Sequence, residues 1–324
     1  MLKRLAVLLA VTVVFSVPIS EAIEAAVIHA SGGIKYDSFT YARPQIPSNV
    51  WDAWRAKDQR IDLWKELWSA NGLSDRIVKI GSSVQGKDIL MFDCGNASSD
   101  AMLLDAELHG EEDHPGEVLL MFVYWLLESE DATAQRILRR NRLLFVPSVN
   151  IDRFSRVNAR PGGGVNLNRN FVKGWGQSGD NTPGSSEYRG PFAGSEPETQ
   201  AIRKTFSDYQ PRIYVNFHVG AFMARGYGNS TLGNAILDKA GSFKSFFGAT
   251  AGRGSGSGGF AVADAVDLSS GCCAWLIEFF GGSDSDLAGN GWERTSWHLD
   301  QLENTYYPAI KEFIIESCIL IEGS

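Results

Sequence analysis

The chain has 324 residues with a formal net charge of −8 at pH 7, and 44% of its residues are hydrophobic. This length is enough to bury one large core or two modest ones. An acidic chain without a clustered basic patch is a poor nucleic-acid binder, because phosphate contacts need grouped Lys and Arg. We therefore expect a globular protein with no nucleic-acid partner.

Residues 1–22 have the pattern of a secretory signal peptide. Two basic residues, Lys3 and Arg4, precede an apolar run from Leu5 to Val17, and a small-residue site at Ser20 to Ala22 follows. The run is short for a transmembrane span, and an uncleaved membrane-anchoring N-terminus is the alternative. No later apolar segment has spanning length. The sequence thus predicts a secreted protein, extracellular or periplasmic, without stable membrane association after signal cleavage.

The remaining chain divides into a short arm and one domain. Residues 23–46 are punctuated by Gly, Pro and Ser and are expected to form an N-terminal arm, and residues 47–324 a single domain. Ser48 to Ala70 is expected to be helical, with Ser48 as N-cap and a stripe of Trp and aliphatic residues against the core.

Strand and helix patterns alternate after this segment. Strands are expected at Arg76–Ile80, Ile89–Asp93, Met102–Leu108, Arg142–Val149, Ile213–Phe217 and Cys273–Phe280. Helices are expected at Pro115–Glu130, Ala132–Arg140, Glu196–Tyr209, Leu232–Phe247 and Ser296–Ile315. Ser195 and Glu198 have the spacing of a capping box. The alternation predicts an α/β fold: a central twisted, mixed and largely parallel sheet with helices on both faces.

Metal-ligating residues follow two of the expected strands. The segment Leu103-Leu-Asp-Ala-Glu-Leu-His-Gly-Glu-Glu112 places His109 and Glu112 three residues apart at a strand end, and His218 ends a later apolar run. Ligands of open α/β sheets bind beyond strand ends, and catalytic zinc sites use three protein ligands and keep one position for water. A second His-x-x-Glu, formed by His114 and Glu117, is the alternative pair.

One carboxylate stands in an otherwise apolar strand. In Ala274-Trp-Leu-Ile-Glu-Phe-Phe280, the flanking residues would bury Glu278, which is costly for an acid without a partner or a function. The four cysteines are too few and too scattered for a disulfide scaffold, which leaves one disulfide or four buried thiols open. They are Cys94, Cys272, Cys273 and Cys318.

Several collinear motifs together resemble a zinc carboxypeptidase of the metallocarboxypeptidase family related to carboxypeptidase A. Beside the segments above, they are Ile80-Gly-Ser-Ser-Val-Gln-Gly-Lys-Asp-Ile89, Gly163-Gly-Val-Asn-Leu-Asn-Arg-Asn-Phe171 and Tyr188-Arg-Gly-Pro-Phe-Ala-Gly-Ser-Glu-Pro-Glu-Thr199. The resemblance covers about residues 75–280. It implies one Zn²⁺ per chain, bound by His109, Glu112 and His218, with Glu278 as the general base that deprotonates the zinc-bound water.

The resemblance also assigns contacts to the substrate. Asn168 and Arg169 match the pair that grips the terminal carboxylate, and a guanidinium fork suits cleavage at a chain end. Arg156 best matches the residue that stabilises the oxyanion, with Arg160 as the alternative. The register differs there because Asn150-Ile-Asp-Arg153 replaces the Asn-Pro-Asp-Gly of the family.

One departure from the family concerns substrate binding. The tyrosine that closes over substrate in the family is expected near Arg253 or Gly254, but no Tyr lies between Tyr227 and Tyr306. Arg253 is a candidate substitute for the carboxylate contact, and a plain flexible loop is the alternative.

The specificity pocket is expected just after Ser257-Gly-Gly259. Phe260, Ala261 and Val262 follow, and no acid stands where it would select a basic side chain. We therefore expect an apolar or aromatic C-terminal residue, unless a shifted loop brings in Asp264.

The resemblance implies a secreted zinc metallocarboxypeptidase that hydrolyses the C-terminal bond of peptides or protein chains, with residues 47–324 as its catalytic domain. One alternative is a zinc amidase or endopeptidase of the same fold, acting on cell-wall γ-glutamyl peptides or acylated amino acids. The other is a non-catalytic peptide-binding relative.

Overall fold

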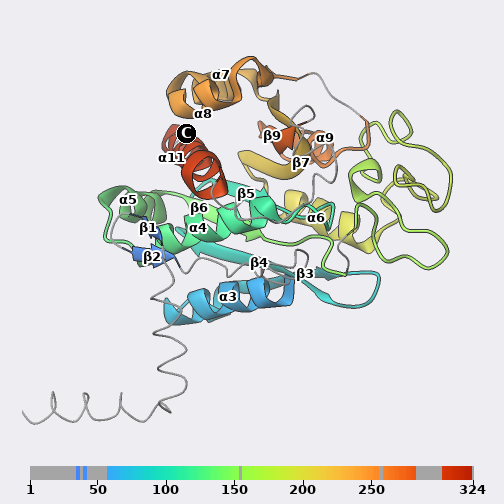
Figure 1. The fold of residues 1–324 in the computed structure, drawn as a ribbon, viewed down its shortest axis with the longest axis horizontal. Coiled ribbons are helices and arrows are strands. Elements are labelled where there is room, and N and C mark those ends of the chain that lie inside the picture. The colour runs from blue at the N-terminus through green and yellow to red at the C-terminus, as the bar shows by residue number, and fades with distance from the viewer. Residues whose placement is uncertain are drawn as a thin grey trace, which may run out of the picture.

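The structure is a computed structural model that describes residues 34–36, 39–41, 57–152, 155–254, 258–281 and 301–322. The expected signal segment, residues 1–22, lies outside the described residues. Within the expected arm, β1 (Ile34–Tyr36) and β2 (Phe39–Tyr41) pair antiparallel. Among the described helices, none is long and apolar enough to cross a bilayer. Figure 1 traces the chain from the arm to the C-terminal helix.

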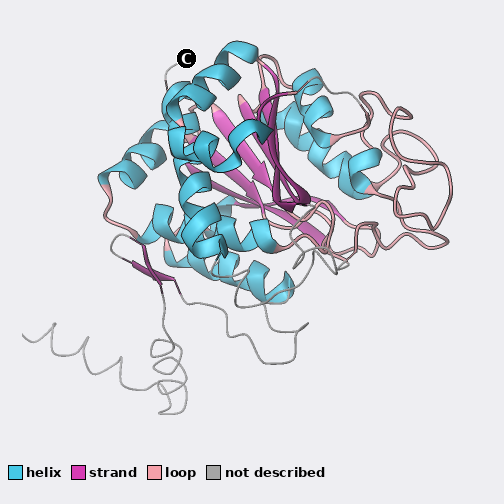
Figure 2. Cartoon of the chain, turned by 45° about the horizontal axis from the view of Figure 1, so that its top comes forward, coloured by secondary structure: helices cyan, strands magenta, loops and turns pink. Residues whose placement is uncertain are grey.

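A seven-stranded sheet runs through the middle of the domain (Figure 2). Its strands are β3 (Ile77–Ser82), β4 (Asp88–Gly95), β5 (Ala101–Asp105), β6 (Arg142–Val146), β7 (Ile213–Gly228), β8 (Ala251–Arg253) and β9 (Cys273–Gly281). The order is β3-β4-β6-β5-β7-β8, and β9 also pairs with β7. The β3–β4 and β4–β6 pairs of this sheet are antiparallel, as is the later part of the β7–β9 pairing, and the other pairs are parallel. The prediction of a mixed, largely parallel sheet is confirmed.

Strand β7 is much longer than expected because it folds back beside β9. The first pairs, from Ile213↔Cys273 to Val219↔Phe279, run in the same direction, and the later pairs, from Met223↔Glu278 to Gly228↔Cys273, run in opposite directions. Between them the chain turns through a segment in which Gly220 and Phe222 have positive φ. Strand β9 is therefore flanked on both sides by β7.

Helices cover both faces of the sheet, as predicted. One face packs against α3 (Lys57–Ala70), α4 (His114–Glu128), α5 (Ala132–Arg140), α7 (Ser230–Lys239), α8 (Gly241–Phe247) and α11 (Tyr307–Ile321). The other face packs against α6 (Pro197–Tyr209) and α9 (Ala261–Leu268). The Trp stripe of α3 belongs to the first core, where Trp64 and Trp68 are fully buried. Each face thus has its own apolar core.

Two expectations about local structure are wrong. The strand expected to reach Leu108 ends at Asp105, because Glu107 adopts a φ of 56° that no strand tolerates. The capping box does not form, since the N-cap of α6 is Glu196 and no side chain caps this helix. Glu198 instead accepts a hydrogen bond from the backbone N–H of Val84, at 2.9 Å.

Other boundaries shift for identifiable reasons. The helix expected over Leu232–Phe247 is two helices, α7 and α8, which meet at Ala240. The described part of the last helix opens with a π-helical turn, Leu302–Tyr306, and continues to Ile321. Strand β8 and helix α9 were not predicted; both are short, and the glycine-rich stretch of residues 252–259 lies between them.

The cysteines are all free and buried, so the thiol alternative holds. Cys272 and Cys273 belong to the cores on opposite faces of the sheet. Burial raises the pKa of all four thiols, which keeps them protonated and unreactive at neutral pH. None of them lies in the metal cluster described below.

Candidate active site

The loop between β5 and α4 presents His109 and Glu112 beside the sheet. The N–H of Glu112 donates to the carbonyl of His109, at 3.1 Å, and Gly110 is tied to the carbonyl of Ser155, at 2.8 Å. Strand β7 pairs with β5, and its His218 lies beside this loop. The imidazole centroids of His109 and His218 are 4.7 Å apart. Three buried side chains from two separate segments therefore meet.

Glu112 lies between the two imidazoles. Its Oε1 is 2.7 Å from Nδ1 of His109, and its Oε2 is 2.7 Å from Nδ1 of His218. Burial alone would raise the pKa of Glu112, but the adjacent imidazoles hold it far below its ordinary value. Within the described residues, these three side chains are the one group that could hold a metal ion, because their potential ligand atoms all lie within 4.8 Å of one another.

Asparagine side chains hold the outer edge of each ring. Nε2 of His109 is 3.0 Å from Oδ1 of Asn166, and Nε2 of His218 is 2.8 Å from Oδ1 of Asn216. An amide oxygen accepts hydrogen bonds, so an imidazole that donates from Nε2 keeps its Nδ1 available to a cation. Both Nδ1 atoms face the carboxylate of Glu112, and these three side chains form the donor set that a zinc ion fits.

Asp105 supports this arrangement from behind. Its Oδ1 accepts from Nδ2 of Asn216, at 2.7 Å, and its Oδ2 from the hydroxyl of Tyr214, at 2.6 Å. Burial raises the pKa of Asp105 to about 6. The sequence analysis missed Asp105 and Asn216, although strand alternation places Asn216 on the same face as His218.

The alternative metal pair lies elsewhere. His114 packs its ring against Phe280, with centroids 5.2 Å apart, and Glu117 directs Oε1 toward Nη1 of Arg60, at 3.5 Å. Neither residue belongs to the three-residue cluster. The geometry therefore favours His109 and Glu112 as the predicted ligands.

Glu278 lies in β9 directly opposite His218 in β7. Burial raises the pKa of Glu278; His218 opposes this increase and Glu112 adds to it. Gly220 leaves room in front of the carboxylate, because a Cβ there would stand 3.9 Å from Oε2 of Glu278. A half-buried carboxylate with open space beside the predicted metal ligands suits a group that exchanges protons.

The two candidate oxyanion arginines have different surroundings. Arg156 lies near the site, with Nη1 3.4 Å from Oε1 of Glu187, and its charge is among those that lower the pKa of Glu278. Arg160 forms an ion pair at 2.7 Å with Glu196, the N-cap residue of α6, and so connects its own loop to this helix. The structure thus favours Arg156 over Arg160.

Asn168 and Arg169 flank the cluster but already have partners. Asn168 accepts from the N–H of Ala261, at 3.0 Å, and its Nδ2 is 3.2 Å from Nε2 of His218. Arg169 donates from Nε to Oε2 of Glu187, at 3.0 Å, and lies 5.0 Å above the ring of Phe260. Glu187 thus contacts the guanidinium that is predicted to bind the substrate carboxylate.

The sequence profile of the zinc carboxypeptidase family matches residues 62–244, more than half of the 324-residue chain. The chain belongs to this family. Mast cell carboxypeptidase A of Mus musculus is 27% identical over 162 residues, which cover 44% of this chain and 39% of the relative. Carboxypeptidase SOL1 of Arabidopsis thaliana is 26% identical over 199 residues, 59% of this chain and 38% of the relative. The chain spans about two fifths of the length of these curated relatives.

Solved structures agree on the fold. Carboxypeptidase A from Helicoverpa armigera superposes with a TM-score of 0.68 at 18% identity, over 93% of this chain and 81% of that one. Bovine thrombin-activatable fibrinolysis inhibitor, solved with a tick carboxypeptidase inhibitor, gives 0.65 at 16% identity, over 82% and 97%. At such identities the likeness shows the carboxypeptidase fold.

Arg253 does not lie at the candidate site. Its guanidinium donates to the carbonyl of Gly228, at 3.0 Å, and lies 5.9 Å from the ring centroid of Trp275. Trp275 belongs to the core on the sheet face opposite Glu278, because side chains alternate along β9. The expectation that Arg253 replaces the missing tyrosine as a carboxylate contact is therefore wrong.

Asp264 also lies outside the expected specificity pocket. It is 1% exposed and accepts hydrogen bonds from the N–H groups of Val172 and Lys173, at 3.2 and 2.5 Å. Arg203 completes an ion pair with it at 2.5 Å. Asp264 holds the loop after Phe171 against α9, so it does not act as a selector of basic side chains.

A buried charge network behind the metal loop was not predicted. Glu107 pairs with Arg60 and lies 2.7 Å from Nζ of Lys57, and the hydroxyl of Ser148 donates to it at 2.6 Å. Arg60 also lies 3.6 Å from Asp113. Helix α3 is thereby connected to both ends of the loop that carries the metal ligands.

We expect Arg60→Met to lower the free energy of unfolding by about 3–5 kcal/mol, because it leaves buried carboxylates without their cation. Denaturant unfolding of the zinc-free protein measures this change. The control is Arg136→Met, whose ion pair with Glu322 is made by a side chain that is 50% exposed, so a much smaller loss is expected. Equal losses in the two variants would contradict a stabilising role for the buried network.

Proposed function

We propose that this zinc carboxypeptidase is a secreted exopeptidase that hydrolyses the C-terminal bond of peptides and protein chains. One Zn²⁺ would be held by His109, Glu112 and His218. The observation that supports this proposal best is that the Nδ1 atoms of two histidines and a carboxylate meet beside the half-buried Glu278. Secretion is supported by the signal-like pattern of residues 1–22.

Different residues of the chain are proposed to carry out different steps of the hydrolysis. When bound, zinc supplies a Lewis acid that polarises the scissile carbonyl and lowers the pKa of a coordinated water to about 7. Glu278 accepts a proton from the attacking water and returns it to the leaving amine. Its raised pKa suits both transfers. Arg156 contributes positive charge where the carbonyl oxygen becomes an oxyanion.

Asn168 and Arg169 are proposed to hold the terminal carboxylate. In the free protein Glu187 is the carboxylate partner of Arg169, and the Glu187 side chain is 37% exposed. A substrate carboxylate can therefore replace Glu187, which turns toward water while Arg169 keeps an anionic partner. This exchange favours substrates with a free C-terminus.

The proposal is tested with matched peptides that have either a free or an amidated C-terminus, followed by mass spectrometry in the presence of zinc. We expect the free peptides to lose one residue at a time and the amides to be largely spared. Cleavage at internal bonds, or of cell-wall γ-glutamyl fragments alone, would support an amidase or endopeptidase instead. Tight peptide binding without any cleavage would support the non-catalytic alternative.

Arg169→Ala is expected to reduce the preference for a free C-terminus. Loss of a charge-assisted contact costs about 1.5–3 kcal/mol, or about 10- to 150-fold in kcat/KM. The amidated peptide never makes this contact and should lose much less. The measurement is the ratio of kcat/KM for a peptide and its amide in both proteins. An unchanged ratio would place carboxylate recognition on another residue.

A further inference from the structure

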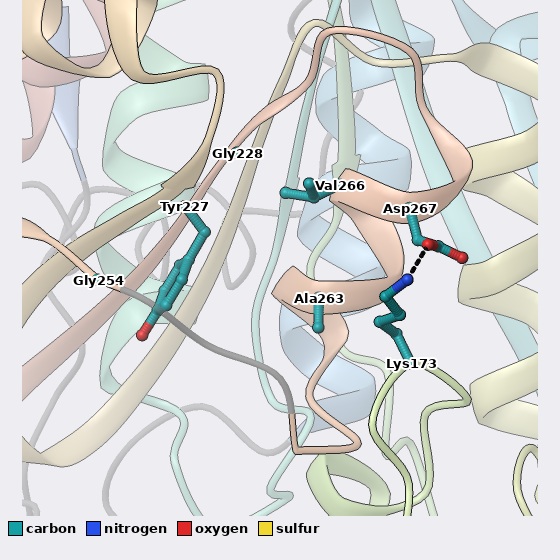
Figure 3. A pocket seen from close by; sticks show the side chains of 7 residues that line it. All are labelled: Lys173, Tyr227, Gly228, Gly254, Ala263, Val266 and Asp267. Carbon is teal, nitrogen blue, oxygen red and sulfur yellow. Dashed lines mark hydrogen bonds and ion pairs between the residues drawn. The ribbon is translucent and has the colours of Figure 1, made fainter.

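A cavity of about 310 Å³ lies on the α9 side of the sheet (Figure 3). The ring of Tyr227 forms one wall, and Ala263 and Val266 of α9 form the opposite wall. Lys173 and Asp267 close one side with an ion pair at 2.6 Å. The remaining lining residues are Gly228 and Gly254. The walls suit a short side chain with an aliphatic stem.

The strand register connects this cavity with Glu278. Directly paired residues of antiparallel strands project to the same face of a sheet. Along the returning half of β7, Met223 pairs with Glu278, and Tyr227 pairs with Ala274 in the same strand as Glu278. The proposed base and the cavity wall therefore share one face of the sheet.

Arg225 lies between these two positions. It pairs with Leu276, so its side chain projects to the same face as Glu278 and Tyr227. A Cβ on Gly252 would stand 2.9 Å from Nη1 of Arg225, which places the guanidinium over the neighbouring strand β8. Burial raises the pKa of Tyr227; the charge of Arg225 lowers it and that of Glu278 raises it. Both charges are thus within electrostatic reach of the cavity wall.

Arg225 differs from the other arginines around the site, because its side chain has no ion pair among the described residues. Arg156 and Arg169 contact Glu187, and Arg203 contacts Asp264. Arg225 is half-buried, and within the described part of the chain its guanidinium makes no hydrogen bond. A partly desolvated guanidinium without an anion is unfavourable, so this position is suited to an anion from a ligand.

We propose that Arg225 binds the side-chain carboxylate of the C-terminal residue, so that preferred substrates end in Glu or Asp. This inference rests on the proposed exopeptidase function, in which Arg169 holds the terminal carboxylate. The stem of the side chain would lie against Tyr227 and Val266. Asp267, the acid that lines the cavity, is already neutralised by its ion pair with Lys173. The apolar preference expected from residues 260–262 is thereby replaced by an acidic one.

The test compares kcat/KM for three peptides that differ only in a C-terminal Glu, Gln or Leu. We expect the parent protein to prefer Glu, and Arg225→Met to lower kcat/KM for the Glu peptide by about 10- to 100-fold while the other two change little. Arg225→Glu should move the preference to a peptide that ends in Lys. Arg253→Met is the matched control, because this arginine lies on the opposite face and should leave the preference unchanged.

A second readout separates binding from turnover. In a Glu278→Gln background, the same Arg225→Met change should raise the Kd of the Glu peptide selectively, measured by intrinsic tryptophan fluorescence. A parent protein that cleaves the Leu peptide as well as the Glu peptide would overturn the inference but leave the exopeptidase function intact. A uniform loss for all free peptides, with amides spared, would instead assign Arg225 to the terminal carboxylate. If no peptide is shortened, the proposed function itself fails.

Discussion

Glu278→Gln is expected to bind zinc and peptide like the parent protein and to lose about 10²- to 10⁴-fold in kcat, the usual contribution of a positioned acid–base group. The amide keeps the shape of the side chain but cannot accept the proton of the attacking water. Gly220 leaves space beside the carboxylate, so the substitution requires no repacking. Single-turnover kinetics at saturating peptide measure the loss, and metal analysis confirms the zinc content.

The matched control is the same change at Glu187, a carboxylate at the rim of the site. Glu187→Gln weakens the resident partner of Arg169, so substrate competes with a neutral amide in place of a carboxylate. We expect KM to fall and kcat to remain near the parent value. Near-normal turnover in Glu278→Gln would rule out Glu278 as the base, whatever the control shows.

His109→Ala is expected to abolish stoichiometric zinc binding. Loss of an outer-shell partner typically reduces metal affinity about 10- to 100-fold, and loss of one of three protein ligands should exceed that. The remaining side chains, Glu112 and His218, would hold the ion with two ligands only. Elemental analysis after dialysis against a weak chelator gives the zinc content per chain.

His114→Ala is the control for this experiment, because His114 belongs to the competing His-x-x-Glu pair. Its ring packs against Phe280 and lies outside the three-residue cluster, so this variant should keep its zinc even if it is less stable. Zinc retained in His109→Ala and lost in His114→Ala would assign the metal to the other pair. Circular dichroism on both variants separates metal loss from unfolding.

Much of the fold was predictable because periodic patterns report on burial. Helix Ala132–Arg140 agrees with its prediction at both ends, and strands such as Ile89–Asp93 were located to within two residues. The ends of elements were harder. Glu107 leaves the strand region because its carboxylate is drawn into a network with Lys57 and Arg60, which come from a helix far away in the chain.

The contacts of side chains outside the motifs could not be predicted from sequence patterns. Arg253 and Arg225 both follow apolar or glycine-rich segments, and the sequence offers no reason to prefer either. Their roles separate only when β7 folds back along β9, because this register directs Arg225 toward the face of Glu278 and Arg253 toward Trp275. A one-residue shift of either strand would exchange the two faces.

The sequence by itself determined the α/β class, the His-x-x-Glu spacing, the distant His218 and the isolated carboxylate of Glu278. These features are local, because a strand that ends in a ligand is recognisable without its neighbours. Only the tertiary structure decided that His109 rather than His114 meets His218, that Glu187 is the partner of Arg169, and that Arg225 has no counter-ion among the described residues. Each of these depends on contacts between segments distant in sequence, where packing and strand register set the distances that chemistry requires.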